Sequence, residues 1–342
     1  MIIFSIIGAL IGAGFASGQE MYLFFYRFGI YGILGLLLCS SLIGMTIYKT
    51  FLIIHKKNIN NYQDFLNEIF YTGNKKTKNK YLNLSYISNI IVNIFLLITF
   101  YIMISGFGAY FEQEFKIYRI IGAIFLAIIC FFILLKDIEG VKKVNSVVVP
   151  ILICIILIIS FMNIKNIDIN KISLKNDYNW LIQAIVYCSY NMILVIPVLV
   201  GMKKYIKNKK QIKTISIISG FIVFLLAISI FLWLTNINIS FDELEMPAVY
   251  VIDTKFSNFS WIYGIVILLS IFSTAISIGI SFLKNVTKNK KSYPQFVAIM
   301  CISGVLISNL GFSNLVKNLF PVFGYLGIVQ IGFILRKKIW KI

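Results

Sequence analysis

The stretch IGAGFASGQE, residues 11–20, lies in the middle of the first apolar segment of the chain, between MIIFSIIGAL and MYLFFYRFGI. Two glycine pairs around it have GxxxG spacing, Gly8/Gly12 and Gly14/Gly18. Such pairs let membrane helices pack closely. The two pairs are out of phase on a helix, however, so a single packing face does not account for all four glycines.

We therefore expect a broken helix in this segment. Gly12 and Gly14 can adopt backbone angles that end a first half-helix near Ile11. Ser17 would cap a second half-helix, with Glu20 three residues later completing an S-x-x-E capping box. Unwound backbone inside a membrane is tolerated only where it is buried in protein or lines a cavity. Its carbonyls and amides would then be ligands for ions and small polar solutes.

The composition is that of a membrane protein. Of 342 residues, 59% are hydrophobic and 13% are charged, and the mean hydropathy is +0.88. Apolar runs of about 18 or more residues, long enough to cross a bilayer, recur along the whole chain. The five cysteines lie in apolar stretches without metal-ligand spacing, which indicates buried hydrophobic residues instead of a disulfide framework. We expect an all-α polytopic membrane protein.

Ten transmembrane helices are predicted from these runs, with no soluble domain between them. They cover residues 1–28, 30–54, 84–111, 116–135, 144–163, 179–202, 211–236, 260–283, 293–311 and 316–335. The longest connection, 55–83, contains NYQDFLNEIF, which can form a short amphipathic helix at the membrane surface.

The net charge of +19 predicts the orientation of the chain. If the N-terminus is cytoplasmic, most of the 32 Lys and Arg residues fall on the cytoplasmic side, including KKYIKNKKQIK at 203–213 and the C-terminal RKKIWK. The acidic loop SFDELEMP at 240–247 falls on the opposite side. We expect both termini inside, and the positive charge requires no nucleic-acid partner.

Glu20 is the one acidic residue placed well inside a predicted span. As a cap it would be stabilised by the positive end of the second half-helix. As an intramembrane acid it would bind a proton, a cation or a substrate amine. The two roles are compatible, and both stay open.

A matching break is expected five helices later if the fold is built from inverted repeats. In residues 179–201 a polar cluster runs from Tyr187 to Asn191, and Pro197 follows. Asn191 would cap a second half-helix, while Ser189 and Tyr190 offer hydroxyls. The alternative is a continuous helix with interhelical hydrogen bonds and a proline kink.

Three hydroxyl residues of the eighth predicted helix share one helical face, namely Ser270, Ser273 and Thr274. Hydroxyls in membrane helices usually bond back to the carbonyl four residues earlier. Together with nearby backbone carbonyls, however, they can form a cage of hard oxygens suited to Na⁺.

GAGFASGQE, followed by an FF and an FG pair, is similar to the opening signature of the YkvI-like bacterial membrane proteins, in the amino acid–polyamine–organocation transporter superfamily. VNSVVVP, YCSYN, MPAVYVI and FPVFGYLG in later segments resemble the same family, and the resemblance covers nearly the whole chain. One departure is the start. Members usually begin with a charged leader, whereas the residues before this break barely reach the inner surface at about 1.5 Å each. We expect a truncated start or a short inner half-helix.

The resemblance implies the five-plus-five inverted-repeat fold known from LeuT, with repeats 1–163 and 164–342 in a single transmembrane domain and with helices 1 and 6 broken. Substrate would lie between the two breaks. In sodium-coupled members one ion lies between helices one and eight. On this chain its ligands would be the carbonyls of Gly8 and Ile11 together with Ser270, Ser273 and Thr274.

The leading functional hypothesis is a secondary active transporter that moves a small amino acid or related zwitterion by alternating access, coupled to Na⁺ or H⁺. Amides of the first break would receive a carboxylate, Glu20, Ser189 or Tyr190 would receive an amine, and Tyr101 would act as an aromatic gate. The full set of expected substrate-binding residues is Gly12, Ala13, Gly14, Phe15, Ala16, Ser17, Gly18, Glu20, Tyr101, Tyr187, Ser189, Tyr190 and Asn191.

The alternative from another class is a receptor that binds a solute without transporting it, as in spore germinant receptors. An enzyme is a poor alternative because the predicted spans hold almost no His, Asp or Glu, and a channel lacks a ring of charges. We expect no cofactor beyond the coupling ion and no catalytic residue. The expected partners are the solute and the lipid of the bacterial cytoplasmic membrane.

Overall fold

The computed structural model describes residues 2–71, 78–163, 172, 178–237, 241, 244, 246–255, 257–287, 289, 291–310 and 312–337. Residue 164 at the repeat boundary, part of the 55–83 connection, the three acidic residues of the 240–247 loop and most of the basic C-terminal run lie outside these residues. The α-helices of the described residues are α1 (Ile2–Leu10), α2 (Ala13–Ala16), α3 (Gln19–Phe24), α4 (Ile30–Lys57), α5 (Tyr62–Phe70), α6 (Lys78–Phe115), α7 (Arg119–Leu134), α8 (Asp137–Asn163), α9 (Asn179–Gly201), α10 (Lys209–Trp233), α11 (Pro247–Lys255), α12 (Ser260–Val286), α13 (Tyr293–Ile307) and α14 (Phe312–Arg336).

The described part of the chain is almost entirely helical, and each of the ten predicted segments contains helix. Seven helices among the described residues are long and apolar enough to cross a membrane, namely α4, α6, α8, α9, α10, α12 and α14. Helices α7 and α13 are apolar but shorter. A membrane protein with several crossings follows from these lengths.

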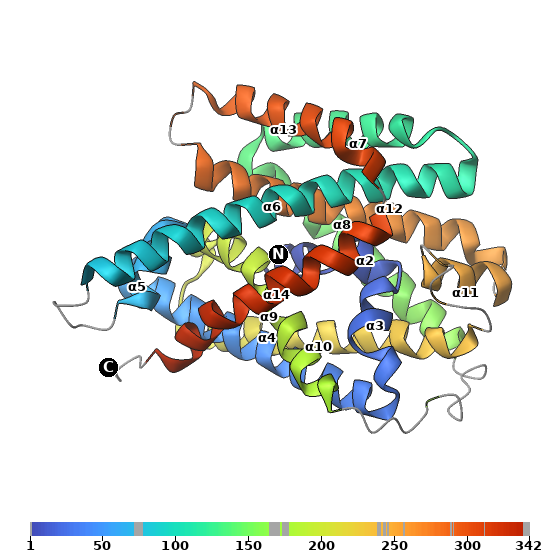
Figure 1. Cartoon of the computed structure of the whole chain (residues 1–342), viewed down its shortest axis with the longest axis horizontal. Helices are drawn as coiled ribbons and strands as arrows, with labels where there is room; N and C mark the ends of the chain where they lie inside the picture. The colour runs from blue at the N-terminus through green and yellow to red at the C-terminus, as the bar shows by residue number, and fades with distance from the viewer. Residues whose placement is uncertain are drawn as a thin grey trace.

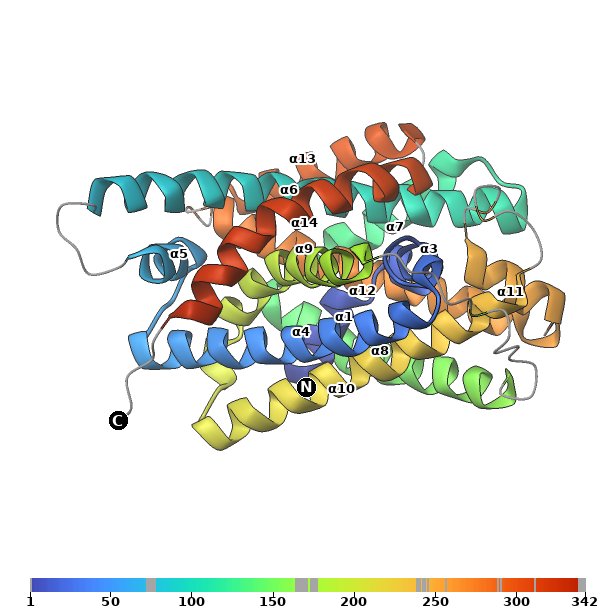
Figure 2. The ribbon, with the colours of Figure 1, turned by 60° about the horizontal axis from the view of Figure 1, so that its bottom comes forward.

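The long helices run roughly along the longest axis of the molecule (Figures 1 and 2). Both views place α5 and the C-terminal end of α14 at one end and α11 at the other. Helix α1 packs against α8, α9 and α12, and α9 packs against α4 and α14. Helix α9 is the most buried of the seven apolar helices, and 89% of the residues in its 18-residue apolar stretch are buried inside the structure. The interior therefore forms around the two segments predicted to be broken.

The short helix expected in the first long connection is α5. Its N-cap is Asn61, whose side chain accepts a hydrogen bond from the Asp64 amide at 2.8 Å. Its apolar face is buried, and the Tyr62 hydroxyl is hydrogen-bonded to Gln330 of α14. Lys337 at the end of α14 donates to the backbone carbonyls of Glu68 and Tyr71. These contacts attach α5 to the C-terminal helix.

The two predicted breaks have different outcomes. The first segment is divided into α1, α2 and α3 by non-helical residues at 11–12 and 17–18. The predicted break of the sixth segment is wrong, because α9 is one continuous α-helix through the whole polar cluster and through Pro197. The Ser189 hydroxyl donates to the Ile185 carbonyl at 2.7 Å, and the Asn191 amide donates to the Tyr187 carbonyl at 3.0 Å. These polar side chains bond within their own helix instead of capping a new one.

Candidate functional site

The interruption of the first segment begins where α1 ends. The Ile11 amide still donates to the Ile7 carbonyl at 2.9 Å. Gly12 then has an extended backbone, with φ −94° and ψ −169°, and is the N-cap of α2. All residues from 11 to 20 are buried. The break is therefore enclosed by protein, as unwound backbone at membrane depth must be.

The second turn, between α2 and α3, depends on Gly18. Its φ of +81° lies in the left-handed region, which disfavours residues with a Cβ. The predicted capping box is wrong, because Gly18, and not Ser17, precedes α3. The Ser17 hydroxyl donates to the Gly14 carbonyl at 3.3 Å and accepts from the Gln19 amide at 3.4 Å. Ser17 thus stabilises the turn through these two hydrogen bonds. The Glu20 side chain takes no part in a capping box and makes its contacts elsewhere.

Glu20 forms a buried cluster with two tyrosines of α9. Its Oε2 accepts hydrogen bonds from the Tyr190 hydroxyl at 2.6 Å and from the Tyr187 hydroxyl at 3.0 Å. Only 3% of its surface is exposed, and no basic side chain in the described part of the chain pairs with it. A carboxyl group with two hydroxyl donors and no cationic partner, buried in a membrane protein, is a strong candidate for a functional group.

The other carboxyl oxygen of Glu20 faces α2. A methyl group placed on Gly14 would lie 2.9 Å from Cγ of Glu20 and closer still to Oε1. The absence of a side chain at Gly14 therefore makes room for the carboxyl group. The Phe24 ring of α3 lies beside the same tyrosines, with its centroid 5.2 Å from that of Tyr187 and 5.6 Å from that of Tyr190.

A second cluster joins α12 to the end of α1. The Thr274 hydroxyl lies 2.8 Å from the Gly8 carbonyl oxygen and 2.9 Å from that of Ile11. The Ser273 hydroxyl lies 3.2 Å from the Gly8 carbonyl oxygen. Four of the five residues expected to bind Na⁺ are thus in direct contact. The fifth, Ser270, directs its hydroxyl to the Ile267 carbonyl of its own helix.

Asn145 of α8 belongs to the same cluster and was not predicted. Its Oδ1 accepts from the Ser273 hydroxyl at 3.1 Å, and its Nδ2 donates to the Ser277 hydroxyl at 2.8 Å. The side chain is completely buried. The sequence signal was present, since Asn145 is an amide in the apolar run VNSVVVP.

Three contacts close the break on the side of α11. The Ala248 amide donates to the Ser17 carbonyl at 2.8 Å. The Gln19 side chain donates to the Leu244 carbonyl, and the Tyr263 hydroxyl donates to the Ala16 carbonyl, both at 2.5 Å. Gln19 and Tyr263 were also missed by the sequence analysis. The residues of the break are therefore covered at this end by Leu244, by the first turn of α11 and by Tyr263 of α12.

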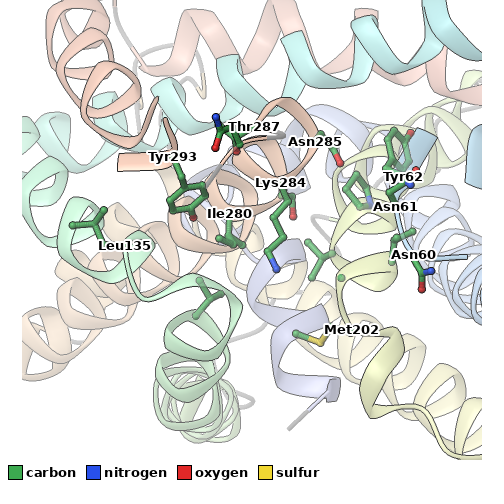
Figure 3. Close-up of a pocket in the computed structure, with 17 residues that line it drawn as sticks. Asn60, Asn61, Tyr62, Leu135, Met202, Ile280, Lys284, Asn285, Thr287 and Tyr293 are labelled. Carbon is green, nitrogen blue, oxygen red and sulfur yellow. The ribbon is translucent and has the colours of Figure 1, made fainter. Parts of the chain in front are cut away.

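A cavity of about 470 Å³ opens at the opposite end, near α5 (Figure 3). Figure 3 shows the Lys284 side chain extending between the residues that α5, α9 and α12 contribute to its walls. Ser281 of α12 lies on its wall and donates to the Ser277 carbonyl one turn deeper. A row of polar groups therefore leads from the cavity through Ser277 and Asn145 to the contacts around Gly8.

Tyr101 lies apart from both clusters. Its hydroxyl is 2.7 Å from the Ser303 hydroxyl of α13, and its ring lies beside Gly304 of the same helix. The structure brings Glu20, Tyr187 and Tyr190 together, but it directs Tyr101 toward α13 and the Ser189 hydroxyl back into α9.

Comparison with known proteins gives two relatives and a structural neighbour. No protein-family model matches the chain. The uncharacterised membrane protein YkvI of Bacillus subtilis (strain 168) is 26% identical over 352 residues, covering 98% of this chain and 94% of the relative. The uncharacterised protein YyaD of the same organism is 25% identical over 343 residues, covering 98% of this chain and 96% of the relative.

Among solved structures, MhsT in complex with L-phenylalanine is similar in fold. The TM-score is 0.68 at 14% sequence identity, and the match covers 96% of this chain and 87% of MhsT. MhsT is a LeuT-fold transporter. Over nearly its whole length, this chain is therefore similar to the membrane protein YkvI and to YyaD, and it has the LeuT fold seen in MhsT.

Proposed function

We propose that the protein is a secondary active transporter that moves a small amino acid or related zwitterion by alternating access, with Na⁺ as the coupling ion. The observation that carries the proposal is the convergence of five oxygen atoms from α1, the residue directly after it, α8 and α12. They are the Gly8 and Ile11 carbonyls, the Ser273 and Thr274 hydroxyls and Oδ1 of Asn145.

The chemistry of these five oxygens suits a monovalent cation. Each hydroxyl now donates its hydrogen to a neighbouring oxygen at 2.8–3.2 Å. A hydroxyl hydrogen can rotate away, which leaves a lone pair for a cation. The set contains no carboxylate, whereas Ca²⁺ and Mg²⁺ sites usually include one. Coordination of Na⁺ by these oxygens would take the place of the hydrogen bonds between them and hold the end of α1 against α8 and α12.

Glu20 is the proposed site for the amine of the solute. A positive ammonium group would pair with the buried carboxyl group, beside the Tyr187 and Tyr190 hydroxyls. The solute carboxylate would bind peptide groups of the break around Gly12, near the proposed cation. That the structurally similar MhsT was solved with L-phenylalanine supports an amino acid as the solute class.

Alternating access fits the two ends of the molecule. The break is covered on the side of α11, while the cavity lies near α5. This is the lysine-rich end of the molecule, where Lys203, Lys284 and Lys337 lie. We propose ten crossings in two inverted repeats, 1–163 and 164–342, with both termini in the cytoplasm of the cell. In this arrangement the cavity would be the cytoplasmic route to the site.

Uptake into proteoliposomes tests the proposal. A mixture of labelled amino acids would be offered under an inward Na⁺ gradient and, separately, under a pH gradient. We expect uptake with Na⁺, loss of the Na⁺ response in Thr274→Val, and little change in Ser270→Ala, whose hydroxyl bonds within its own helix. Uptake that follows pH alone and disappears in Glu20→Gln would instead establish proton coupling. Solute binding without flux under either gradient would indicate a receptor.

A further inference from the structure

Helices α4 and α10 cross in very close contact. A methyl group on Gly44 would lie 3.2 Å from the Ser216 carbonyl oxygen, and one on Gly220 would lie 3.0 Å from the Ser40 carbonyl oxygen. Small residues at the crossing thus bring the two backbones together. Bulky side chains on either side of the crossing leave a groove of about 600 Å³ on the outer surface of the molecule.

The wall of this groove is apolar and faces outward. Its exposed hydrophobic residues are Leu37, Met45, Tyr48, Ile217 and Phe221. The hydroxyls in the wall are already bonded within their own helices, Ser40 and Ser41 to the Leu37 carbonyl and Ser216 to the Ile212 carbonyl. Along these serines the groove therefore offers an acyl chain a surface whose hydroxyls are already bonded.

The length of the groove matches one leaflet of a bilayer. It runs along α4 from Leu37 to Tyr48 and along α10 from Phe224 to Lys213. Each wall rises about 16 Å at 1.5 Å per residue. This length is about half of the roughly 30 Å hydrocarbon core. A groove that begins at the interface would end near the middle of the membrane.

One end of the groove is basic. Lys213 lines it opposite Tyr48, and Lys209 and Lys210 lie one turn further along α10, all three lysines being exposed. Tyrosine is enriched at the level of lipid headgroups. Lysines at the cytoplasmic end of a groove between membrane helices are suited to anionic headgroups.

We propose that this groove binds one anionic phospholipid from the leaflet at the lysine-rich end, with its phosphate at Lys213 and an acyl chain along Gly44 and Gly220. A second copy of the chain would cover the same apolar wall but would supply no anion to Lys213 unless it placed an acidic residue there. The lipid would fill the groove beside the crossing and hold α4 against α10. This site is independent of the proposed transport function.

Lipid retention by the purified protein tests the proposal. The protein in neutral detergent would be titrated with phosphatidylglycerol or phosphatidylcholine, and bound lipid would be counted by native mass spectrometry. We expect phosphatidylglycerol to be preferred and Lys213→Gln to weaken its binding about fivefold, the contribution of one lysine at a membrane surface. Lys255→Gln removes the same charge from exposed Lys255 at the α11 end and should have no effect.

Ser41→Trp would fill the groove and should abolish binding of both lipids. Equal losses in Lys213→Gln and Lys255→Gln would show that only net charge matters, and would overturn the proposal. Unchanged phosphatidylglycerol binding in Ser41→Trp would place the lipid elsewhere. If that variant instead converted a dimer to a monomer with lipid binding intact, the occupant would be a second copy. Lys213→Gln changes only an exposed residue, so its result stands even if Ser41→Trp does not fold.

Discussion

Replacing Gly14 by alanine should displace Glu20 from its tyrosine partners. The added methyl group would lie 2.9 Å from Cγ and 3.0 Å from Cδ of Glu20, and closer still to Oε1, so the carboxyl group has to move. Gly12→Ala is a matched control in the same break. Its methyl group would meet Thr274 and Met103 at 3.3–3.4 Å, a tight contact that a small shift relieves. Neither glycine has a positive φ, so the two variants differ in contacts and not in backbone strain.

The expected loss of stability follows from the hydrogen bonds between Glu20 and the two tyrosines. Oε2 of Glu20 accepts from Tyr190 at 2.6 Å and from Tyr187 at 3.0 Å, and a shift of about 1 Å breaks at least the longer bond. A buried hydrogen bond to a charged group contributes about 1.5–3 kcal/mol. Overpacking destabilises the folded state by a further ~1–3 kcal/mol. Alanine also lowers the conformational entropy of the unfolded chain, which stabilises the protein by ~0.4–1 kcal/mol. Gly14→Ala should therefore destabilise the protein by about 2–5 kcal/mol, and Gly12→Ala by about 1 kcal/mol or less.

A double-mutant cycle separates this mechanism from general crowding. Unfolding of the purified protein in detergent would be followed for the wild type, Gly14→Ala, Tyr190→Phe and the double variant. If Gly14→Ala acts by moving Glu20 away from Tyr190, Tyr190→Phe should lower the free energy of unfolding much less in the Gly14→Ala protein than in the wild type. Additive losses, or equal losses for Gly14→Ala and Gly12→Ala, would refute the reasoning.

Three further predictions concern the surroundings of the site. Tyr263→Phe should lower both thermal stability and uptake, because its hydroxyl bonds to the break, whereas Tyr101→Phe should lower stability alone. Ser273→Ala should raise the Na⁺ concentration for half-maximal uptake about tenfold or more, since weakened metal coordination typically lowers metal affinity by that factor. Ser270→Ala should leave this concentration unchanged. Ala248→Pro removes one amide donor in the first turn of α11, where proline is tolerated, and should speed hydrogen–deuterium exchange in residues 13–24.

The helices and the break of the first segment follow from local sequence. Apolar runs long enough to cross a membrane become helices because only internal hydrogen bonding satisfies their backbone there. Gly18 supplies the left-handed turn that few other residues adopt. These features depend on neighbours in the chain, so length, hydropathy and glycine position predict them.

The α9 helix and the partners of Glu20 depend on tertiary contacts. A polar cluster such as Tyr187 to Asn191 has the same local pattern in a broken helix and in a continuous helix whose side chains bond backward. The contacts of Tyr187 and Tyr190 with Glu20 join residues 167 and 170 positions apart in the sequence, and spacing within one helix cannot predict them. Asn145 was missed for the same reason, since its partners lie on α12.

Thermal unfolding in Na⁺ tests most directly whether the end of the first half-helix is a binding site. Purified protein would be melted in increasing NaCl against choline chloride at constant ionic strength, for the wild type and Thr274→Val. A ligand at 100 times its dissociation constant stabilises the folded state by about 2.7 kcal/mol. The wild type should show a saturable rise in melting temperature with Na⁺ alone, and Thr274→Val should lose it. Equal curves in the two salts, or the same Na⁺ shift in Thr274→Val, would contradict the cation site.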